Sequence, residues 1–256
     1  MKTLESAAKA FLRTLGLKLS RVPARNVDVV PRDYAGVRSW ASYTPWNTDV
    51  DFQSVYQMVR DYTLVDEFRC YVLWSLVAQV SKLPTGAIVE VGVWRGGSGG
   101  LIAHRARRCG IRDTVYLCDT FSGVVKAGAL DPHYEGGEHA DTSQSTVEEL
   151  VAGKLELDNV RILRGVFPDE TAQGIQESCI RLCHIDVDVY ESARDVFDWV
   201  WPRMAIGGVF VFDDYGFDTC QGIRQYADEL SAQSGLIGFY NLSGQFILVK
   251  NRDVRH

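Results

Sequence analysis

From residue 87 onward, short apolar runs alternate with longer stretches of helical periodicity. The runs are rich in β-branched residues, each is followed by turn or polar residues, and they cover 87–92, 114–119, 159–165, 182–186 and 209–213. Continuous apolar runs of this kind are typical of parallel strands that are covered on both faces by helices. The pattern therefore predicts five parallel strands joined by crossover helices.

The last two apolar runs, 236–241 and 245–250, are separated only by Leu-Ser-Gly. This connection is too short for a parallel crossover, so we expect the two runs to pair as an antiparallel hairpin, after a helix at 221–234. The sequence thus predicts an α/β fold with a mostly parallel seven-stranded sheet. This strand inventory is similar to the class I (Rossmann-like) fold of S-adenosylmethionine-dependent methyltransferases.

The first 61 residues follow a different pattern. Residues 1–25 carry six basic side chains against one acid, Glu5, with apolar residues at helical spacing. This indicates a basic amphipathic helix, which either packs on its own domain or serves as a membrane-surface, targeting or oligomerisation element. Residues 26–62, rich in aromatic residues and proline, look irregular and could cover an active site, while 65–82 looks helical. We therefore predict an N-terminal extension, 1–61, and a main domain, 62–256.

Composition and charge narrow the class of protein. The 256 residues are 46% hydrophobic and 23% charged, which suits a folded domain with a large core. A net charge of −6 gives no general attraction to phosphate backbones, so we expect no nucleic-acid partner. There is no signal-peptide core and no run long enough to span a bilayer. The six cysteines lack zinc-site spacing and indicate reduced thiols in a cytoplasmic protein.

A glycine-rich turn follows the first predicted strand, from Glu90 to Ser98, where backbone N–H groups can approach a ligand. Trp94 stands where a dinucleotide motif needs its second glycine, which disfavours a nicotinamide cofactor. Glu90, inside an apolar strand, would suit the α-ammonium group of S-adenosylmethionine, or would make a structural hydrogen bond to a neighbouring loop. Asp119 closes the second strand and could accept both ribose hydroxyls, or cap the next segment.

Four aspartates follow two further strands: Asp186 and Asp188, then Asp213 and Asp214. If these strands are neighbours, the four carboxylates meet at one sheet edge and repel unless protons or a cation intervene. An oxygen-rich cluster selects a hard cation such as Mg²⁺. Each aspartate alone could instead cap a helix or lie in a surface loop. Residues 122–146, which we name the lid segment, are glycine-rich and polar, a composition typical of a functional loop.

The sequence resembles the macrocin O-methyltransferase (TylF-like) family of sugar O-methyltransferases from about residue 62 to 250. The residues that carry the resemblance are Tyr62–Leu64, Glu90–Gly97, Asp119–Gly123, Gly165–Thr171, Ile185–Ser192 and Asp213–Gly216. The resemblance implies a class I methyltransferase fold, S-adenosylmethionine as donor, and Mg²⁺ bound by Asp186, Asp213 and Asp214. It also implies Asp188 as general base.

The same resemblance implies a donor-binding set of Glu90, Gly92, Asp119, Tyr62, Thr63 and Ser122. Tyr62 and Thr63 match the segment that closes over the methionine end of the donor. Val187 departs from the family pattern, which has glycine between the two aspartates. The implied acceptor is a sugar hydroxyl of a glycosylated natural product or saccharide, and a homo-oligomer is expected. The alternatives are methylation of a catechol or other phenol, and a catalytically silent methyltransferase-like binding module.

Overall fold

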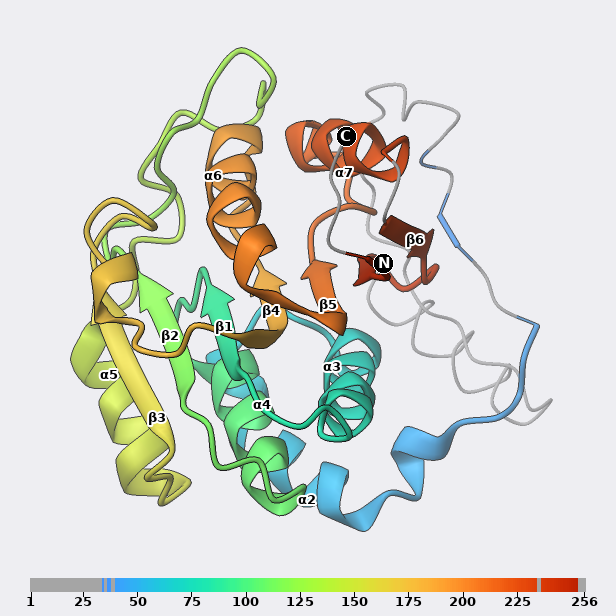
Figure 1. The fold of residues 1–256 in the computed structure, drawn as a ribbon, viewed down its shortest axis with the longest axis vertical. Coiled ribbons are helices and arrows are strands. Elements are labelled where there is room, and N and C mark those ends of the chain that lie inside the picture. Colours follow the sequence, from blue (N-terminus) through green and yellow to red (C-terminus); the bar gives the residue numbers. More distant parts are fainter. Residues whose placement is uncertain (1–33, 35, 38–39, 234–235, 253–256) are drawn as a thin grey trace, which may run out of the picture. The chain divides into compact units, whose positions relative to one another are not determined.

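The computed structural model contains a seven-stranded sheet with the order β3-β2-β1-β4-β5-β7-β6 (Figure 1). The strands are β1 (Ala87–Val91), β2 (Val115–Asp119), β3 (Val160–Arg164), β4 (Ile180–Ile185), β5 (Met204–Phe212), β6 (Leu236–Tyr240) and β7 (Phe246–Lys250). The first five are parallel, and β7 pairs antiparallel with both β5 and β6. The predicted α/β class, the parallel strands and the terminal hairpin are therefore confirmed.

The structure describes residues 34, 36–37, 40–233 and 236–252. Residues 1–36 form a unit separate from 37–256, and only the second unit is described below. The predicted basic helix at 1–25 lies outside the described residues. The division of the chain at 61/62 stays a prediction. Within the described part of the chain, no helix has both the length and the apolar character that a bilayer crossing requires.

Helices cover both faces of the sheet. One face packs against α2 (Val50–Val59), α3 (Glu67–Val80), α4 (Gly97–Arg108) and the short α5 (Gln144–Glu148) with the π-helix η4 (Glu149–Lys154). The other face packs against α6 (Tyr190–Val200) and α7 (Gln221–Ser231). The remaining helical segments are single 3-10 turns: η2 (Pro45–Asn47), η3 (Arg60–Tyr62), η5 (Ala172–Gly174) and η6 (Trp201–Arg203). Alternate residues of each central strand enter opposite cores, as the pleat requires.

Helix α2 lies in a segment for which the sequence analysis expected irregular structure. Asp49 caps it, since its Oδ1 accepts a hydrogen bond from the backbone N–H of Phe52 at 2.9 Å. Phe52, Val55 and Val59 lie on one side of the helix and are buried in the core shared with α3 and α4. The spacing of these three residues is helical, and burial of that face against two other helices stabilises the segment.

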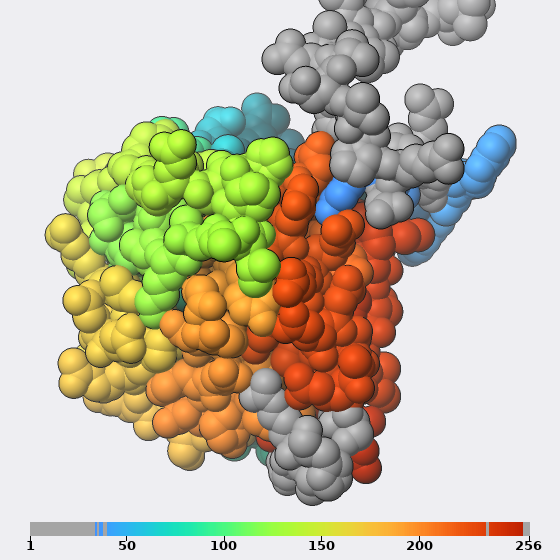
Figure 2. Space-filling model, turned by 90° about the horizontal axis from the view of Figure 1, so that it is seen from above, coloured from blue at the N-terminus to red at the C-terminus, as the bar shows by residue number. Residues whose placement is uncertain are grey.

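The strand order reverses at β1, which lies between β2 and β4. Ligands of open α/β sheets bind beyond the carboxyl ends of the strands at such a switch point. At this edge a Cβ on Gly92 would lie 1.7 Å from the carbonyl oxygen of Asp186, so only glycine fits there. Figure 2 shows, from above, that the green part of the lid segment lies against the orange segments around α6.

Candidate active site at the carboxyl ends of the strands

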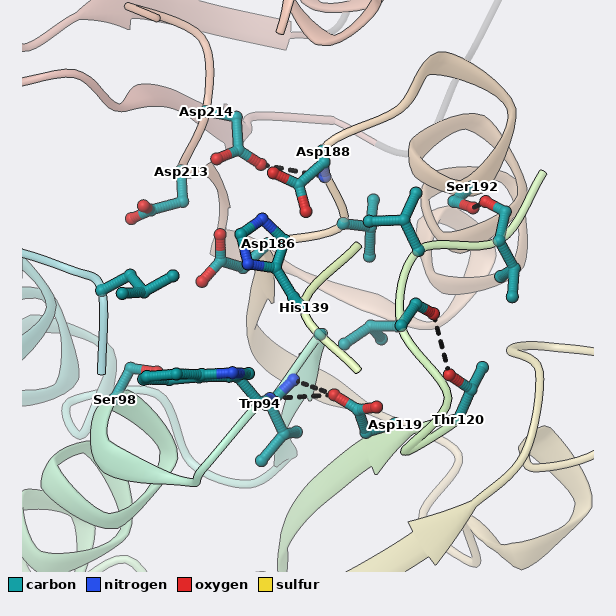
Figure 3. A pocket seen from close by; sticks show the side chains of 18 of the residues that line it. Trp94, Ser98, Asp119, Thr120, His139, Asp186, Asp188, Ser192, Asp213 and Asp214 are labelled. Carbon is teal, nitrogen blue, oxygen red and sulfur yellow. Dashed lines mark hydrogen bonds between the residues drawn. The ribbon is translucent and has the colours of Figure 1, made fainter. Parts of the chain in front are cut away.

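A cavity of about 300 Å³ opens at the carboxyl ends of β1, β2, β4 and β5. Its wall includes the turn after β1, part of the lid segment and residues 63–65. Seven of the predicted site residues line it: Thr63, Gly92, Asp119, Asp186, Asp188, Asp213 and Asp214. In Figure 3 the four aspartates that follow β4 and β5 lie on one side of the cavity, opposite Trp94 and Asp119. The structure therefore brings most of the predicted site together.

Asp119 joins the end of β2 to the glycine-rich turn after β1. Its Oδ2 accepts hydrogen bonds from the backbone N–H groups of Val93 at 2.6 Å and Trp94 at 2.9 Å. Its Oδ1 accepts one from the N–H of Phe121 at 2.6 Å. A carboxylate has about four positions at which it can accept a hydrogen bond, and three of them already accept the bonds that order the two loops. The predicted ribose contact stays a prediction.

Three predicted donor-binding residues do not line the cavity. Glu90 is completely buried, and its Oε1 lies 2.8 Å from Nδ1 of His184, while its Oε2 has no hydrogen-bond partner among the described residues. The ring of Tyr62 lies 4.9 Å from Nζ of Lys154 and packs against the core on the α4 side. Ser122 is exposed. Contact of these residues with a donor stays a prediction.

The predicted convergence of four aspartates is present in the structure. Ile185 of β4 and Phe212 of β5 are register partners, so the residues that follow them, Asp186 and Asp213, leave neighbouring strands at the same level. The backbone N–H of Asp188 donates to Oδ2 of Asp214 at 3.1 Å, and Asp188 itself adopts a left-handed conformation with φ of 65°. The parallel pairing of two adjacent strands therefore creates the cluster.

Burial and mutual repulsion set the ionisation of this cluster. Burial is the main cause that raises the pKa of Asp186, Asp188 and Asp214, and neighbouring carboxylates raise it further. The pKa of Asp213 is shifted in the opposite direction. Although burial opposes its ionisation, the guanidinium of Arg69 and the imidazole of His184 hold the pKa of Asp213 below its usual value.

His184 is a buried residue of the site that the sequence analysis did not assign. It stands on β4 in register with Glu90, and its Nε2 lies 3.2 Å from Oδ1 of Asp213. Burial opposes its charge, but these two carboxylates outweigh burial and raise the pKa of His184 well above the ordinary value. One signal in the sequence could have indicated this pair. His184 lies inside one apolar predicted strand, and Glu90, an acid without a partner in its own strand, lies inside another.

Two further residues, Tyr134 and Arg69, reach the aspartates from outside the sheet. The hydroxyl of Tyr134, in the lid segment, donates to Oδ1 of Asp188 at 2.7 Å. Arg69 on α3 pairs its Nη1 with Oδ2 of Asp213. His139 of the lid segment also lines the cavity, whereas His133 does not. The composition of the lid segment predicted a functional loop, but no local pattern showed which side chain points inward.

The chemistry of the donor atoms suits a hard divalent cation. Two groups of possible ligand atoms are present, and within each group the atoms lie no more than 4.8 Å apart: His184 with Asp186 and Asp213, and Asp188 with Asp214 and Cys220. Of the three predicted metal ligands, Asp186 and Asp213 therefore share one group, and Asp214 lies in the other. The four aspartates and Glu90 make five carboxyl groups, and two basic groups, Arg69 and His184, pair with members of this set. The carboxylate of Asp186 makes no hydrogen bond to any described residue. This excess of negative oxygen ligands fits Mg²⁺.

Comparison with known proteins gives one family and three curated relatives. The family model Macrocin-O-methyltransferase (TylF) matches residues 54–237. The chain is 34% identical over 148 residues to 8-demethyl-8-(2,3-dimethoxy-alpha-L-rhamnosyl)-tetracenomycin-C 4'-O-methyltransferase of Streptomyces olivaceus, covering 53% of this chain and 55% of that protein. It is 31% identical over 159 residues to demethyldecarbamoylnovobiocin O-methyltransferase of Streptomyces niveus, covering 58% and 59%. It is 30% identical over 156 residues to mycinamicin III 3''-O-methyltransferase of Micromonospora griseorubida, covering 56% and 61%. Each match therefore spans less than two thirds of the relative.

Solved structures show the same architecture. The O-methyltransferase NovP superposes with a TM-score of 0.63 at 25% identity, over 75% of this chain and 83% of that chain. The calicheamicin methyltransferase CalS11 superposes with a TM-score of 0.60 at 17% identity, over 83% and 95%. At that identity the second likeness concerns the fold alone. Together with the strand order, these structures confirm the predicted class I methyltransferase fold.

Proposed function

Because this chain belongs to the macrocin O-methyltransferase (TylF) family, we propose that it transfers a methyl group from S-adenosylmethionine to a sugar hydroxyl of a glycosylated natural product or saccharide. The three curated relatives are named as O-methyltransferases, and one of the names specifies a rhamnosyl compound. The observation that carries the proposal is that four aspartates, Asp119 and the glycine-rich turn share one cavity.

The proposed donor site lies along the turn after β1. Gly92 lets this turn pass close to the backbone of Asp186, Asp119 holds the N–H groups of the turn in place, and Thr63 lies on the cavity wall. Glu90, Tyr62 and Ser122 remain in the proposed donor set on the family resemblance alone.

The proposed acceptor site lies at the four aspartates. Asp186, Asp213 and Asp214 would hold Mg²⁺, which when bound supplies Lewis acidity toward the hydroxyls of the acceptor. Asp188 would accept the proton of the attacking hydroxyl. Burial raises the pKa of Asp188, so this carboxylate is a stronger base than an exposed aspartate. The hydroxyl of Tyr134 holds Oδ1 of Asp188 and leaves Oδ2 for that proton.

Methyl transfer from a sulfonium to an oxygen removes a positive charge from the donor. A closed site that excludes water favours this loss of charge. The lid segment fits that role because it is tied down at several places. The backbone of Tyr190 donates to Asp131 at 2.9 Å, and Lys126 pairs with Asp195 at 2.7 Å.

We also propose that the protein is a cytoplasmic homo-oligomer that binds no nucleic acid. This part of the proposal depends on the family resemblance and the net negative charge. Light scattering after size-exclusion chromatography would measure the assembly, and a monomer at micromolar concentration would contradict it.

The test of the proposed function is calorimetric titration with S-adenosylmethionine and S-adenosylhomocysteine, each with Mg²⁺ and with EDTA. We expect both compounds to bind, and we expect a separate Mg²⁺ signal that is lost in Asp186→Asn but kept in Asp169→Asn, an exposed control. Methyl transfer is then assayed with rhamnosides and with catechol. Transfer to catechol but to no glycoside would favour a phenol acceptor. Failure to bind either compound at high micromolar concentration would indicate a silent binding module.

A further inference from the structure

Arg69 on α3 is a buried arginine whose guanidinium reaches the aspartate cluster. Its Nη1 pairs with Oδ2 of Asp213, its Nε lies 2.8 Å from Oδ2 of Asp66, and its Nη2 donates to the carbonyl oxygen of Leu64 at 3.0 Å. The ring of Phe217 lies 4.7 Å from the guanidinium carbon. Because the guanidinium is planar and rigid, these contacts fix its orientation against the cluster.

Asp213 is the one aspartate of the cluster that the protein itself neutralises. In addition to Arg69 on Oδ2, its Oδ1 accepts a hydrogen bond from Nε2 of Gln245 at 2.7 Å and lies 3.2 Å from Nε2 of His184. Both oxygens therefore already have partners. By contrast, the carboxylate of Asp186 makes no hydrogen bond to the residues that the structure describes.

A divalent cation and Arg69 would have to share the same carboxylate. Mg²⁺ binds carboxylate oxygens directly, at about 2.0–2.1 Å. The guanidinium already lies in contact with Oδ2 of Asp213, in a position where 7% of the arginine is exposed. Two positive charges this close together repel strongly where little water screens them. Arg69 and the cation therefore cannot both make their best contact with Asp213.

We propose that Arg69 is an internal counter-ion of the aspartate cluster, which pairs with Asp213 when no metal is bound and competes with the divalent cation for that carboxylate. Arg69 acts through Asp213 and is a positioning residue. The same side chain holds the backbone of Leu64, and Thr63, Leu64 and Val65 line the cavity. If the metal displaced the guanidinium, the hydrogen bond to Leu64 would change as well, and with it the position of this part of the cavity wall. The inference rests on the metal site of the proposed function.

The experiment is calorimetric titration of the full chain with MgCl₂ after treatment with EDTA, with no donor or acceptor present. Arg69→Met keeps the length of the side chain and removes its charge, and Arg69→Lys restores the charge. Arg181→Met is the matched control, because Arg181 is also a buried arginine paired with an aspartate, Asp113, and lies at the opposite end of β4 from the cluster.

We expect Arg69→Met to bind Mg²⁺ about tenfold more tightly than the unmodified protein, since a repelling charge has been removed. Arg69→Lys and Arg181→Met should bind it as the unmodified protein does. Equal or weaker binding by Arg69→Met would overturn the inference. If neither protein binds Mg²⁺ although both bind S-adenosylmethionine, the proposed metal site is wrong, and this inference is wrong with it. If the unmodified protein does not bind S-adenosylmethionine, the proposed function itself is contradicted.

Arg69→Met removes every polar contact of the buried guanidinium, so a second measurement uses the unmodified protein. Crystal structures with and without Mg²⁺ would show the contact between Nη1 of Arg69 and Oδ2 of Asp213 directly. We expect this contact to be present without the metal and to be broken or lengthened with it. A guanidinium that keeps the same contact while Mg²⁺ is bound to Asp213 would overturn the inference.

Discussion

Glu90 on β1 and His184 on β4 stand in register, and Oε1 of the first lies 2.8 Å from Nδ1 of the second. Both side chains are completely buried. The pair continues to Asp213, which directly follows β5, so charged groups from three neighbouring strands or their ends are joined beneath the cavity. Because an unpaired buried charge is costly, the chain can place Glu90 inside its central strand only with such a partner.

The first prediction concerns the charge of His184. Its folded-state pKa is raised above about 6.5, the usual value in an unfolded chain. The contribution of His184 to the free energy of unfolding is therefore fully present below about pH 6.5, and it is lost as the pH rises through the folded-state pKa. We expect ¹⁵N NMR of the protein in EDTA to show both ring nitrogens protonated at about pH 7.5. A neutral ring at that pH would contradict the ion pair.

The second prediction concerns the close approach at Gly92. An added Cβ would lie 1.7 Å from the carbonyl oxygen of Asp186, and the residue has φ of 87°. Gly110 has φ of 74° but nothing within 4 Å of an added Cβ, so it isolates the effect of backbone conformation. We expect Gly110→Ala to lower the free energy of unfolding by about 1 kcal/mol and Gly92→Ala by about 3 kcal/mol or more. Urea unfolding measures both, and equal losses would refute the steric argument.

The third prediction tests Asp188 as the base. Asp188→Asn keeps the size of the side chain and removes its capacity to accept a proton. We expect kcat to fall by about 100-fold or more, while the dissociation constant of S-adenosylmethionine stays unchanged. Asp228→Asn serves as control, because it changes an exposed aspartate whose carboxylate accepts a hydrogen bond from the hydroxyl of Tyr215. A turnover near that of the unmodified protein in Asp188→Asn would remove this residue as the base.

The fourth prediction concerns the hydroxyl of Tyr134. Tyr134→Phe removes the hydrogen bond to Oδ1 of Asp188 and should lower kcat by about tenfold with little change in the donor dissociation constant, because this hydrogen bond orients the base. Tyr190→Phe also removes a hydrogen bond from a tyrosine to a carboxylate, that of Glu229, on the exposed side of α6. We expect this control to keep full turnover. Equal kcat in the two variants would exclude a positioning role for Tyr134.

Much of the fold could be read from local patterns. The five apolar runs and the closely spaced final pair predicted the strands and the hairpin, because strands such as β1 and β4 are covered by helices on both faces and bury every side chain. The missed helix α2 shows the limit of this reading. Its apolar face is only three residues, Phe52, Val55 and Val59, and it becomes stable through burial against α3 and α4.

The sequence by itself also determined where the chemistry gathers, since parallel strands end at one edge and carry Asp186, Asp188, Asp213 and Asp214 there. Only the tertiary structure decided which atoms meet. It turned Glu90 toward His184 and away from the cavity, and it brought Arg69 to Asp213 across 144 residues of sequence. The physical reason is that periodicity specifies the face and the end of an element, whereas buried charges find their partners through packing between elements that are distant in the chain.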